Sequence, residues 1–283
     1  MAGPEPAALP LGDAPILYNY TANIKKNKAH TFFRQFLSFS RIIVNMDGKV
    51  FDRIEKKYLI TKEDKKSILT AIKKHMKKDN YYKSEVFNLY FDTDNYDLII
   101  QSIDQPVFKH KLRARSYGGY DRVFLEIKTK IRGQDMNPGY KRRVMITHQD
   151  FDELEDGKTS MVELSSRQVE TTNDLQIARE IDYLIEHFDL KPKILVIYNR
   201  ESYKGEDNLR ITFDEKLKFR NQNLNFNRTK RDKIYFKDKH NIIMEVKAHG
   251  VLPLWLVREM SRLKIYPQQF SKVGKIYEKL TKE

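Results

Sequence analysis

Residues 111–130 read KLRARSYGGYDRVFLEIKTK, and this stretch decides the fold. Two alternating segments flank Gly118-Gly119, a pair that accepts the positive φ angles of a tight turn, so the stretch predicts a β-hairpin. Successive strand residues point to opposite faces, so pairing of Tyr117 with Tyr120 would bring the charged residues of both strands onto one side. Those charged residues are Lys111, Arg113, Arg115, Arg122, Glu126, Lys128 and Lys130.

The cationic face of this hairpin has two interpretations. Antiparallel sheets commonly expose one face to water, so the charges could simply be solvated. Like charges directly across a strand pair are destabilising, however, and a bound polyanion would neutralise them. The same alternation of charged and apolar residues recurs in RIEKKYLI at 53–60, LRITFD at 209–214 and NIIMEVKAH at 241–249. This recurrence favours a polyanion site.

The composition fits a globular protein with an anionic partner. The 283 residues are enough for a sizeable core, and 16 Tyr and 16 Phe argue against disorder. The net charge of +14 predicts a nucleic acid, a membrane surface or a phosphate-rich small molecule as the partner. The absence of Cys excludes disulfides, thiolate metal sites and cysteine nucleophiles, and it fits a reducing compartment. No apolar run approaches the roughly 20 residues of a transmembrane helix, and the N-terminus does not resemble a signal peptide.

Strands and helices are expected to alternate along one domain of residues 46–283, which follows a flexible or helical N-terminal extension of residues 1–45. The predicted strands cover 53–60, 86–93, 111–117, 122–130, 138–147, 192–203, 209–214 and 241–249, with an edge strand within 216–239. The predicted helices cover 23–44, 61–76, 96–103, 150–155, 175–188, 253–263 and 271–280. Since many strands have a polar face, we expect an α+β protein with a mostly antiparallel sheet that is curled or closed.

The polar faces of these strands, if they turn inward, would form a basic tunnel. Its cations would be Lys57, Lys111, Arg113, Arg115, Lys128, Lys141, Arg143, Arg200, Arg210 and Lys247, beside the carboxylates Glu55, Glu126 and Glu245. Burying unpaired charges is costly, so such a centre is reasonable only as a receptor for a multiply charged anion. Arginine forks and lysine point charges suit phosphate oxygens, and carboxylates among them could hold a divalent metal that bridges phosphates.

Motifs for nucleophilic or zinc-dependent chemistry do not occur in the chain. There is no GxxxxGK[ST] loop, no GxGxxG pattern, no HExxH motif and no GxSxG elbow. His75, His110, His187 and His249 lack the spacing of a ligand set. Phosphate chemistry here would therefore rely on positioning and charge neutralisation, without a protein nucleophile.

Short motifs along the chain carry a family resemblance. They are RIEKKYL at 53–59, NLYFDT at 88–93, KLRARSY at 111–117, FLEIKTK at 124–130, Tyr198-Asn199-Arg200, RITFD at 210–214, IMEVK at 243–247 and Ser271-Lys272. Their order resembles that of the VTC domain, the catalytic domain of vacuolar transporter chaperone polyphosphate polymerases and their bacterial relatives. That domain belongs to the triphosphate tunnel metalloenzymes, or CYTH superfamily, and the resemblance covers about residues 50–280.

The resemblance implies a closed antiparallel β-barrel tunnel of about eight strands with helices packed outside. It also implies a polyphosphate polymerase that transfers the ATP γ-phosphate to a growing inorganic polyphosphate chain, with Mn²⁺ or Mg²⁺ as the cofactor. By family position the catalytic residues that grip phosphates would be Lys57, Arg113, Arg115, Lys128, Arg200, Arg210 and Lys272. Supporting cations would be Lys111, Lys141, Arg143 and Lys247, and the metal would be held by Glu245, with Glu126 and Glu55 as further candidates.

Two departures from the family pattern refine this expectation. The wider superfamily opens with ExExK, whereas Arg53 replaces the first Glu here and leaves Glu55 and Lys57. An added cation suits the binding of a phosphate chain better than simple triphosphate hydrolysis. No inositol-phosphate-sensing domain and no membrane span are recognisable, so we expect a free-standing, bacterial, cytoplasmic enzyme.

Two alternatives stay open. A tunnel hydrolase would release phosphate from triphosphate or nucleotides, and a non-catalytic protein would bind polyphosphate or nucleic acid. Nucleic acid is not expected as a partner, because base-stacking platforms interleave aromatics with cations and most aromatics here lie on apolar faces. The expected partners are ATP and inorganic polyphosphate, and the sequence leaves the oligomeric state open.

Overall fold

The computed structural model describes residues 53–104, 108–118, 121–131, 139–167, 172–226, 232–236, 238 and 240–282. All of them belong to the unit Asp52–Glu283. The N-terminal extension predicted for residues 1–45, with its helix over 23–44, lies outside the described residues.

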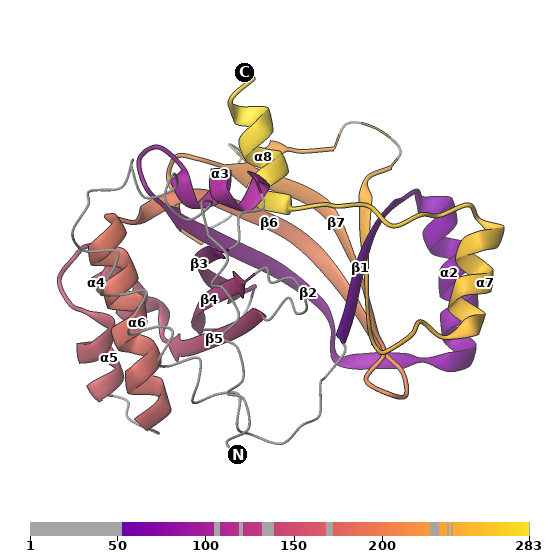
Figure 1. The fold of residues 1–283 in the computed structure, drawn as a ribbon, viewed down its shortest axis with the longest axis horizontal. Helices are drawn as coiled ribbons and strands as arrows, with labels where there is room; N and C mark the ends of the chain where they lie inside the picture. The colour runs from indigo at the N-terminus through magenta and orange to yellow at the C-terminus, as the bar shows by residue number, and fades with distance from the viewer. Residues whose placement is uncertain are drawn as a thin grey trace, which may run out of the picture. The chain divides into compact units, whose positions relative to one another are not determined.

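The described unit is built on one antiparallel sheet (Figure 1). Its strands are β1 (Arg53–Ile60), β2 (Lys77–Asp92), β3 (Phe108–Tyr117), β4 (Val123–Ile131), β5 (Gly139–Ile146), β6 (Lys191–Lys204), β7 (Arg210–Arg220), β8 (Lys233–Ile234) and β9 (Ile242–His249). The strand order is β1-β9-β7-β6-β2-β3-β4-β5, and the short β8 pairs with β7. The α+β class and the antiparallel sheet expected from the sequence are therefore present.

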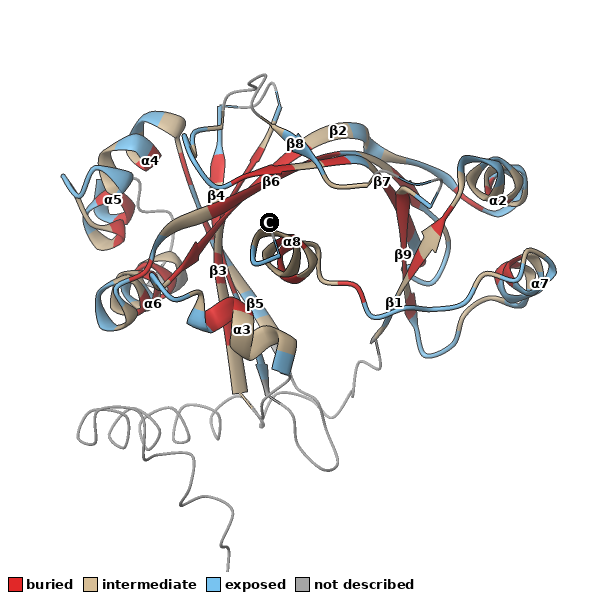
Figure 2. Cartoon of the chain, turned by 90° about the horizontal axis from the view of Figure 1, so that it is seen from above, coloured by how far each residue is buried: buried red, intermediate tan, exposed pale blue. Residues whose placement is uncertain are grey.

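The sheet curves but is not closed by hydrogen bonds. Strands β1 and β5 lie at the two ends of the strand order, and within the described residues no ladder joins them. Seen from above, the strands curl around a central helix, so the sheet has a concave and a convex face (Figure 2). The closed barrel expected from the family resemblance is thus not confirmed, whereas the curvature is.

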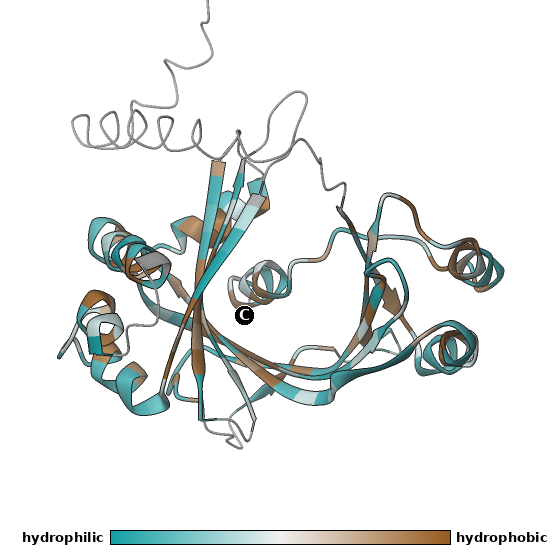
Figure 3. Ribbon diagram, turned by 90° about the horizontal axis from the view of Figure 1, so that it is seen from below, coloured by the Kyte–Doolittle hydropathy of each residue, from teal (hydrophilic) through white to brown (hydrophobic). Residues whose placement is uncertain are grey.

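Two groups of helices cover the convex face. The helices α4 (His148–Glu155), α5 (Met161–Arg167) and α6 (Thr172–Phe188) pack on the β2–β5 side, and α2 (Lys62–His75) and α7 (Leu254–Arg262) pack on the β1, β7 and β9 side. Each group buries the apolar residues that alternate with the charged ones along the strands, such as Leu112 and Ala114 of β3 or Met244 and Val246 of β9. Figure 3 shows this mixture of hydrophobic and hydrophilic residues along the strands.

Two helices contribute apolar side chains to the concave side, which corrects the expectation that every helix packs outside, although one of them also places Leu98 in the cluster of the convex side. The helices α3 (Asp97–Asp104) and α8 (Lys272–Leu280) supply Ile99, Val273 and Ile276 to a cluster with Tyr90 and Tyr198 of the sheet. Figure 2 shows α8 within the curve of the strands. The helix expected over 271–280 is present, but the sequence does not say which face of the sheet it covers.

A β-bulge in β7 lets this strand serve both parts of the concave face. Lys216 has a φ of 54°, and the register with β6 shifts by one residue beside it. Before the bulge Asp214 faces the polar part of the concave face, and after it Leu217 joins the apolar cluster under α8. An extra residue in one strand reverses which side chains face inward, and this explains why the alternation in the sequence ended at Asp214.

The hairpin of β3 and β4 is present, with a register two residues away from the expected one. Arg113 lies opposite Glu126 and Ser116 lies opposite Val123, so Tyr117 cannot be the partner of Tyr120. A shift by two residues preserves which side chains share a face. The predicted cationic face is therefore correct although the predicted pair is wrong.

Candidate functional site

The strand ladders bring the predicted site residues onto the concave face. Residues directly opposite each other in an antiparallel ladder share a face. The ladders place Lys57 opposite Glu245, Arg210 opposite Lys247, Arg200 opposite Asp214, Arg113 opposite Glu126, and Lys128 opposite Lys111 and Lys141. Cations from seven strands, β1, β9, β7, β6, β3, β4 and β5, thus face a common side, and α8 adds Lys272 to them.

The first cluster is centred on Asp214, whose side chain is fully buried. Arg200 donates two hydrogen bonds to it, from Nε to Oδ1 over 2.6 Å and from Nη2 to Oδ2 over 2.8 Å. Lys272 Nζ lies 2.6 Å from Oδ2, and both cations sit over the ring of Tyr198. Burial would raise the pKa of Asp214, but Lys272 and Arg200 outweigh it and hold this pKa below its ordinary value.

The second cluster is centred on Glu126, which is 2% exposed. Arg113 donates from Nε to Oε2 over 2.8 Å and also places Nη2 2.6 Å from that oxygen, while Lys141 Nζ contacts Oε1. Arg115 Nε lies 3.8 Å from Oε2 and donates a hydrogen bond to Asn88 Oδ1. Burial opposes ionisation, but Arg113, Arg115 and Lys141 lower the pKa of Glu126 to about 2.

The third cluster holds Glu245 and Glu55. Glu245 Oε1 lies 2.7 Å from Lys247 Nζ, and Glu55 lies 3.8 Å from Lys57 Nζ and 3.6 Å from Lys247 Nζ. Although burial opposes it, the charges of Lys247, Lys272 and Lys57 hold the pKa of Glu245 well below its ordinary value. The effect of Lys272 on Glu245 shows that the first and third clusters are within electrostatic reach of each other.

The first turn of α8 lies against the lysines of β1 and β3. Lys57 Nζ donates to the carbonyl of Phe270 over 3.1 Å, and Lys111 Nζ donates to Ser271 Oγ over 3.2 Å. Ser271 also caps α8 by accepting from the amide of Gly274. A helix N-terminus carries partial positive charge and free amide groups, so it favours an anion at the same place as these lysines.

Burial and mutual repulsion perturb the lysines of this region. Burial lowers the pKa of Lys57. The charges of Lys272 and Lys128 lower it further, whereas the charge of Glu245 raises it. The pKa of Lys111 falls to about 8, chiefly through burial and then through Lys57 and Lys128. The neighbouring Tyr90 accepts a hydrogen bond from Arg113, and although burial opposes it, Arg113 and Lys111 lower its pKa to about 8. These shifts are those of a site whose positive charge is only partly compensated.

Three further predicted cations are exposed and lie outside the tight clusters. Arg210 is paired with Asp79 over 3.0 Å and bonds Ser202, away from Asp214. Arg143 is exposed and lies over the ring of Phe124, and Lys128 is also exposed. The structure thus gathers Arg113, Arg115, Arg200 and Lys272 into tight clusters and leaves these three near water.

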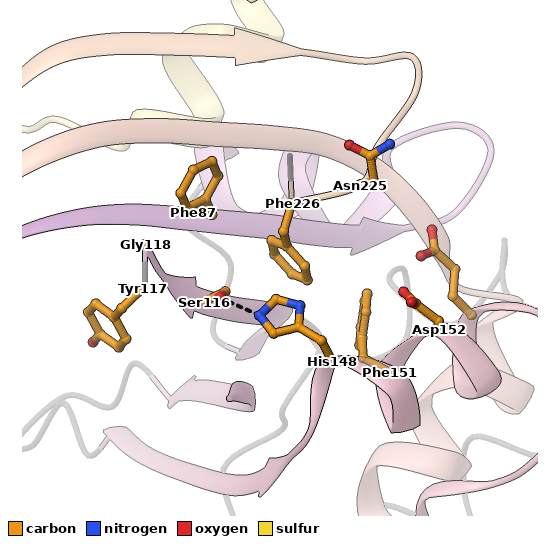
Figure 4. A pocket seen from close by; sticks show the side chains of 10 residues that line it. Phe87, Ser116, Tyr117, Gly118, His148, Phe151, Asp152, Asn225 and Phe226 are labelled. Carbon is orange, nitrogen blue, oxygen red and sulfur yellow. Dashed lines mark hydrogen bonds between the residues drawn. The ribbon is translucent and has the colours of Figure 1, made fainter. Parts of the chain in front are cut away.

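A separate pocket of about 430 Å³ lies on the convex side, between α4, the end of β3 and residues 225–226 (Figure 4). Its walls include Phe87, Phe151 and Phe226, and Ser116 Oγ lies 2.9 Å from His148 Nε2. None of the predicted phosphate-binding cations lines it. We therefore place the candidate site on the concave face.

A protein-family model described as the VTC domain matches residues 52–281. The chain belongs to the VTC domain family. The match covers every strand and helix of the described unit, so the whole curved sheet with its α8 is the VTC domain.

Solved structures resemble this VTC domain only distantly. A Pyrococcus horikoshii protein shares 13% identity over 80% of this chain and 99% of its own, with a TM-score of 0.42. A putative adenylate cyclase of Vibrio parahaemolyticus shares 13% over 80% and 98%, with a TM-score of 0.41. A putative adenylyl cyclase of Hippeastrum, described as having a dominant triphosphatase activity, shares 16% over 78% and 93%, with a TM-score of 0.44. Similarities at this level do not indicate the function of the present VTC domain.

The described part of the VTC domain contains no group of three His, Cys, Asp or Glu side chains placed to hold a metal ion. Glu245 engages Lys247 through Oε1 alone among the described residues, and Glu55 is partly exposed nearby. Magnesium is usually bound by one or two carboxylates together with substrate phosphates, so this pair fits a metal that arrives with a phosphate ligand. None of the described helices has the length and apolar character needed to cross a membrane.

Sequence analysis did not assign a role to Asp214, although it placed this residue on the polar face of its strand. The residue closes the RITFD motif, two positions after Thr212 and four after Arg210. An acidic residue on a face otherwise predicted to bind anions was the available signal. Its partner Lys272 comes from the far end of the chain, and no local pattern predicts that contact.

Proposed function

We propose that this VTC domain is an ATP-dependent polyphosphate polymerase. The observation that carries the proposal is the convergence of Lys57, Lys111 and the N-terminus of α8, next to the Arg200 and Arg113 clusters. Half-buried cations gathered around one helix start, with carboxylates that compensate only part of their charge, are stabilised by a multiply charged anion. A linear phosphate chain supplies that charge at regular intervals along the face.

The proposed reaction needs no side-chain nucleophile. A terminal oxygen of the phosphate chain attacks the γ-phosphorus of ATP, a new phosphorus–oxygen bond forms, and the bond from the γ-phosphorus to the β,γ-bridging oxygen breaks. ADP leaves, and the chain is longer by one phosphate. Lys57, Arg113, Arg115, Lys128, Arg200, Arg210 and Lys272 are proposed to bind and orient the phosphates. The guanidinium and ammonium groups would stabilise the charge on the transferred group, which is the main contribution a protein makes to phosphoryl transfer.

The supporting residues and the enclosure of the site belong to the same proposal. Lys111, Lys141, Arg143 and Lys247 would extend the cationic track beyond the reacting phosphates. A closed tunnel would require side chains of β1 to meet those of β4 and β5 across the gap in the ladders. The influence of Lys128 on the pKa of Lys57 supports that proximity.

A divalent cofactor, Mn²⁺ or Mg²⁺, would be held by Glu245 with Glu55 in support, and it would neutralise charge on the phosphates when bound. Glu126 was a further candidate from the sequence. Its two oxygens are engaged by Arg113 and Lys141, so it is the weakest candidate of the three.

The test is to incubate the protein with ATP and Mn²⁺ or Mg²⁺ and to size the products on a polyacrylamide gel. A polymerase gives a ladder of long phosphate chains together with ADP. Free phosphate alone would indicate a tunnel hydrolase, and binding without turnover would indicate a non-catalytic polyanion-binding protein. Either of the last two results would overturn the proposal.

A further inference from the structure

Asp214 has no free oxygen in this structure. Arg200 bonds both of its oxygens, and Lys272 shares Oδ2 at 2.6 Å. The three residues come from β7, β6 and the start of α8, so one buried carboxylate fixes the distance between two cations on separate elements. It also ties the first turn of α8 to the sheet.

Glu126 repeats this arrangement on the other side of the concave face. Its Oε2 accepts from Arg113 of β3, and its Oε1 contacts Lys141 of β5. Glu126 belongs to β4, which lies between these two strands in the sheet, and it is nearly as buried as Asp214. Each carboxylate therefore holds two cations that sequence analysis assigned to the phosphates.

Glu245 differs from both, because among the described residues its ion pair with Lys247 uses Oε1 alone. A carboxylate with one oxygen available can bind a metal ion. A carboxylate with both oxygens bonded to cations cannot do so without breaking those pairs, which is costly at a buried site. The contacts of Glu55 with Lys57 and Lys247, at 3.8 and 3.6 Å, are longer than hydrogen bonds, so Glu55 groups with Glu245. The four acidic residues of the three clusters thus divide into two kinds.

We propose that Asp214 and Glu126 are positioning residues, which hold the pairs Arg200–Lys272 and Arg113–Lys141 at the spacing required by neighbouring phosphates and do not bind metal. The proposal deepens the proposed function, on which its mechanistic meaning rests. Asp214 is added here to the residues of the candidate site, since neither the strand pattern nor the family resemblance gave it a role.

The experiment measures whether the loss of one negative charge tightens or weakens phosphate binding. Removing a negative charge from an anion site should tighten phosphate binding, because the site becomes more positive. Removing a positioning residue should weaken binding, because the freed cations lose their geometry. The two explanations therefore predict opposite changes for Asp214→Asn and Glu126→Gln.

Tripolyphosphate binding is measured by calorimetry in EDTA, where no metal contributes. We expect Asp214→Asn and Glu126→Gln to weaken binding tenfold or more. The matched control is Asp94→Asn, since Asp94 also pairs with two lysines, Lys191 and Lys193, but on the exposed surface. Unchanged or tighter binding by Asp214→Asn would overturn the proposal, and so would failure of the unmodified protein to bind tripolyphosphate.

A conservative variant covers the case in which Asp214→Asn does not fold. Asp214→Glu keeps the charge but moves the carboxylate by one methylene, so the positioning role predicts weaker binding at unchanged net charge, whereas a role in overall charge predicts wild-type binding. For turnover, we expect both variants to raise KM for ATP and lower kcat. Sizing of the products that the unmodified protein makes from ATP tests the polymerase activity separately. If the protein only hydrolyses ATP, and Asp214→Asn still weakens tripolyphosphate binding, the proposed function is wrong but the positioning role of Asp214 stands.

Discussion

Lys111 Nζ donates a hydrogen bond to Ser271 Oγ over 3.2 Å, and this contact joins β3 to the first turn of α8. The lysine is largely buried, and burial lowers its pKa to about 8. Near neutral pH the free site therefore holds a lysine that gives up its proton readily, beside a helix end that attracts anions.

The pKa of Lys111 predicts that phosphate binding takes up protons. Between pH 8 and 9 much of Lys111 is neutral in the free protein, and a bound polyanion raises its pKa, so a proton enters with the ligand. Tyr90, with a pKa of about 8, gains a proton for the same reason. Tripolyphosphate affinity should fall as pH rises from 8 to 10. Calorimetry at pH 8.5 in buffers of different ionisation enthalpy measures the uptake.

Lys111→Met is the control for this pH effect. It should reduce the proton uptake by more than half, since the variant loses the titration of Lys111 and also raises the pKa of Tyr90, which the charge of Lys111 helps to lower. An unchanged uptake in the variant would remove Lys111 from the linkage.

Glu245→Gln should abolish metal-dependent synthesis while the fold survives. The carboxylate is nearly buried, and the glutamine amide has a similar size but cannot balance the charge of a divalent ion. We expect turnover to fall by roughly 100-fold or more, as is typical when a group that stabilises transition-state charge is lost. Product formation is followed across a Mn²⁺ titration, with thermal melting to confirm folding. Full activity would exclude Glu245 from the mechanism.

Arg113→Ala should destabilise the protein more than a surface arginine would. It leaves Glu126 buried with fewer partners, and the loss of one member of a buried ion pair costs about 3 kcal/mol. Arg122→Ala, at an exposed residue just before β4, should change the free energy of unfolding by less than about 0.5 kcal/mol. Urea unfolding compares the two. Adding Glu126→Gln to Arg113→Ala should recover part of the loss, and no recovery would argue against the buried charge as the cause.

Thr61→Ala tests a purely structural feature. The Thr61 side chain accepts from the amide of Asp64, whose carboxylate bonds back to the Thr61 amide, so a capping box begins α2. Its loss should lower stability by about 1 kcal/mol without altering tripolyphosphate binding. Thr70→Ala, in the exposed middle of the same helix, is the matched control. A change in binding would show that α2 influences the site.

Alternation in the sequence was enough to predict which residues share the cationic face. Arg113, Lys128 and Glu245 fell on the correct side because strand residues alternate strictly, and even the wrong partner for Tyr117 preserved that side. The alternation does not predict which distant segments of the chain contact each other. The contact of Lys272 with Asp214, and the position of α8 inside the curve, depend on how β7 and the C-terminal helix meet in space.

The β-bulge at Lys216 fixes the number of residues that β7 needs in order to face both parts of the concave side. Deleting this one residue would remove the left-handed step, rotate the rest of β7 by half a turn about its axis, and aim Leu217 and Phe219 away from α8. In their place Lys218 and Arg220 would face the apolar side of α8. Natural variants of this protein should therefore tolerate a change of residue at 216, glycine above all, far better than a change in the number of residues there.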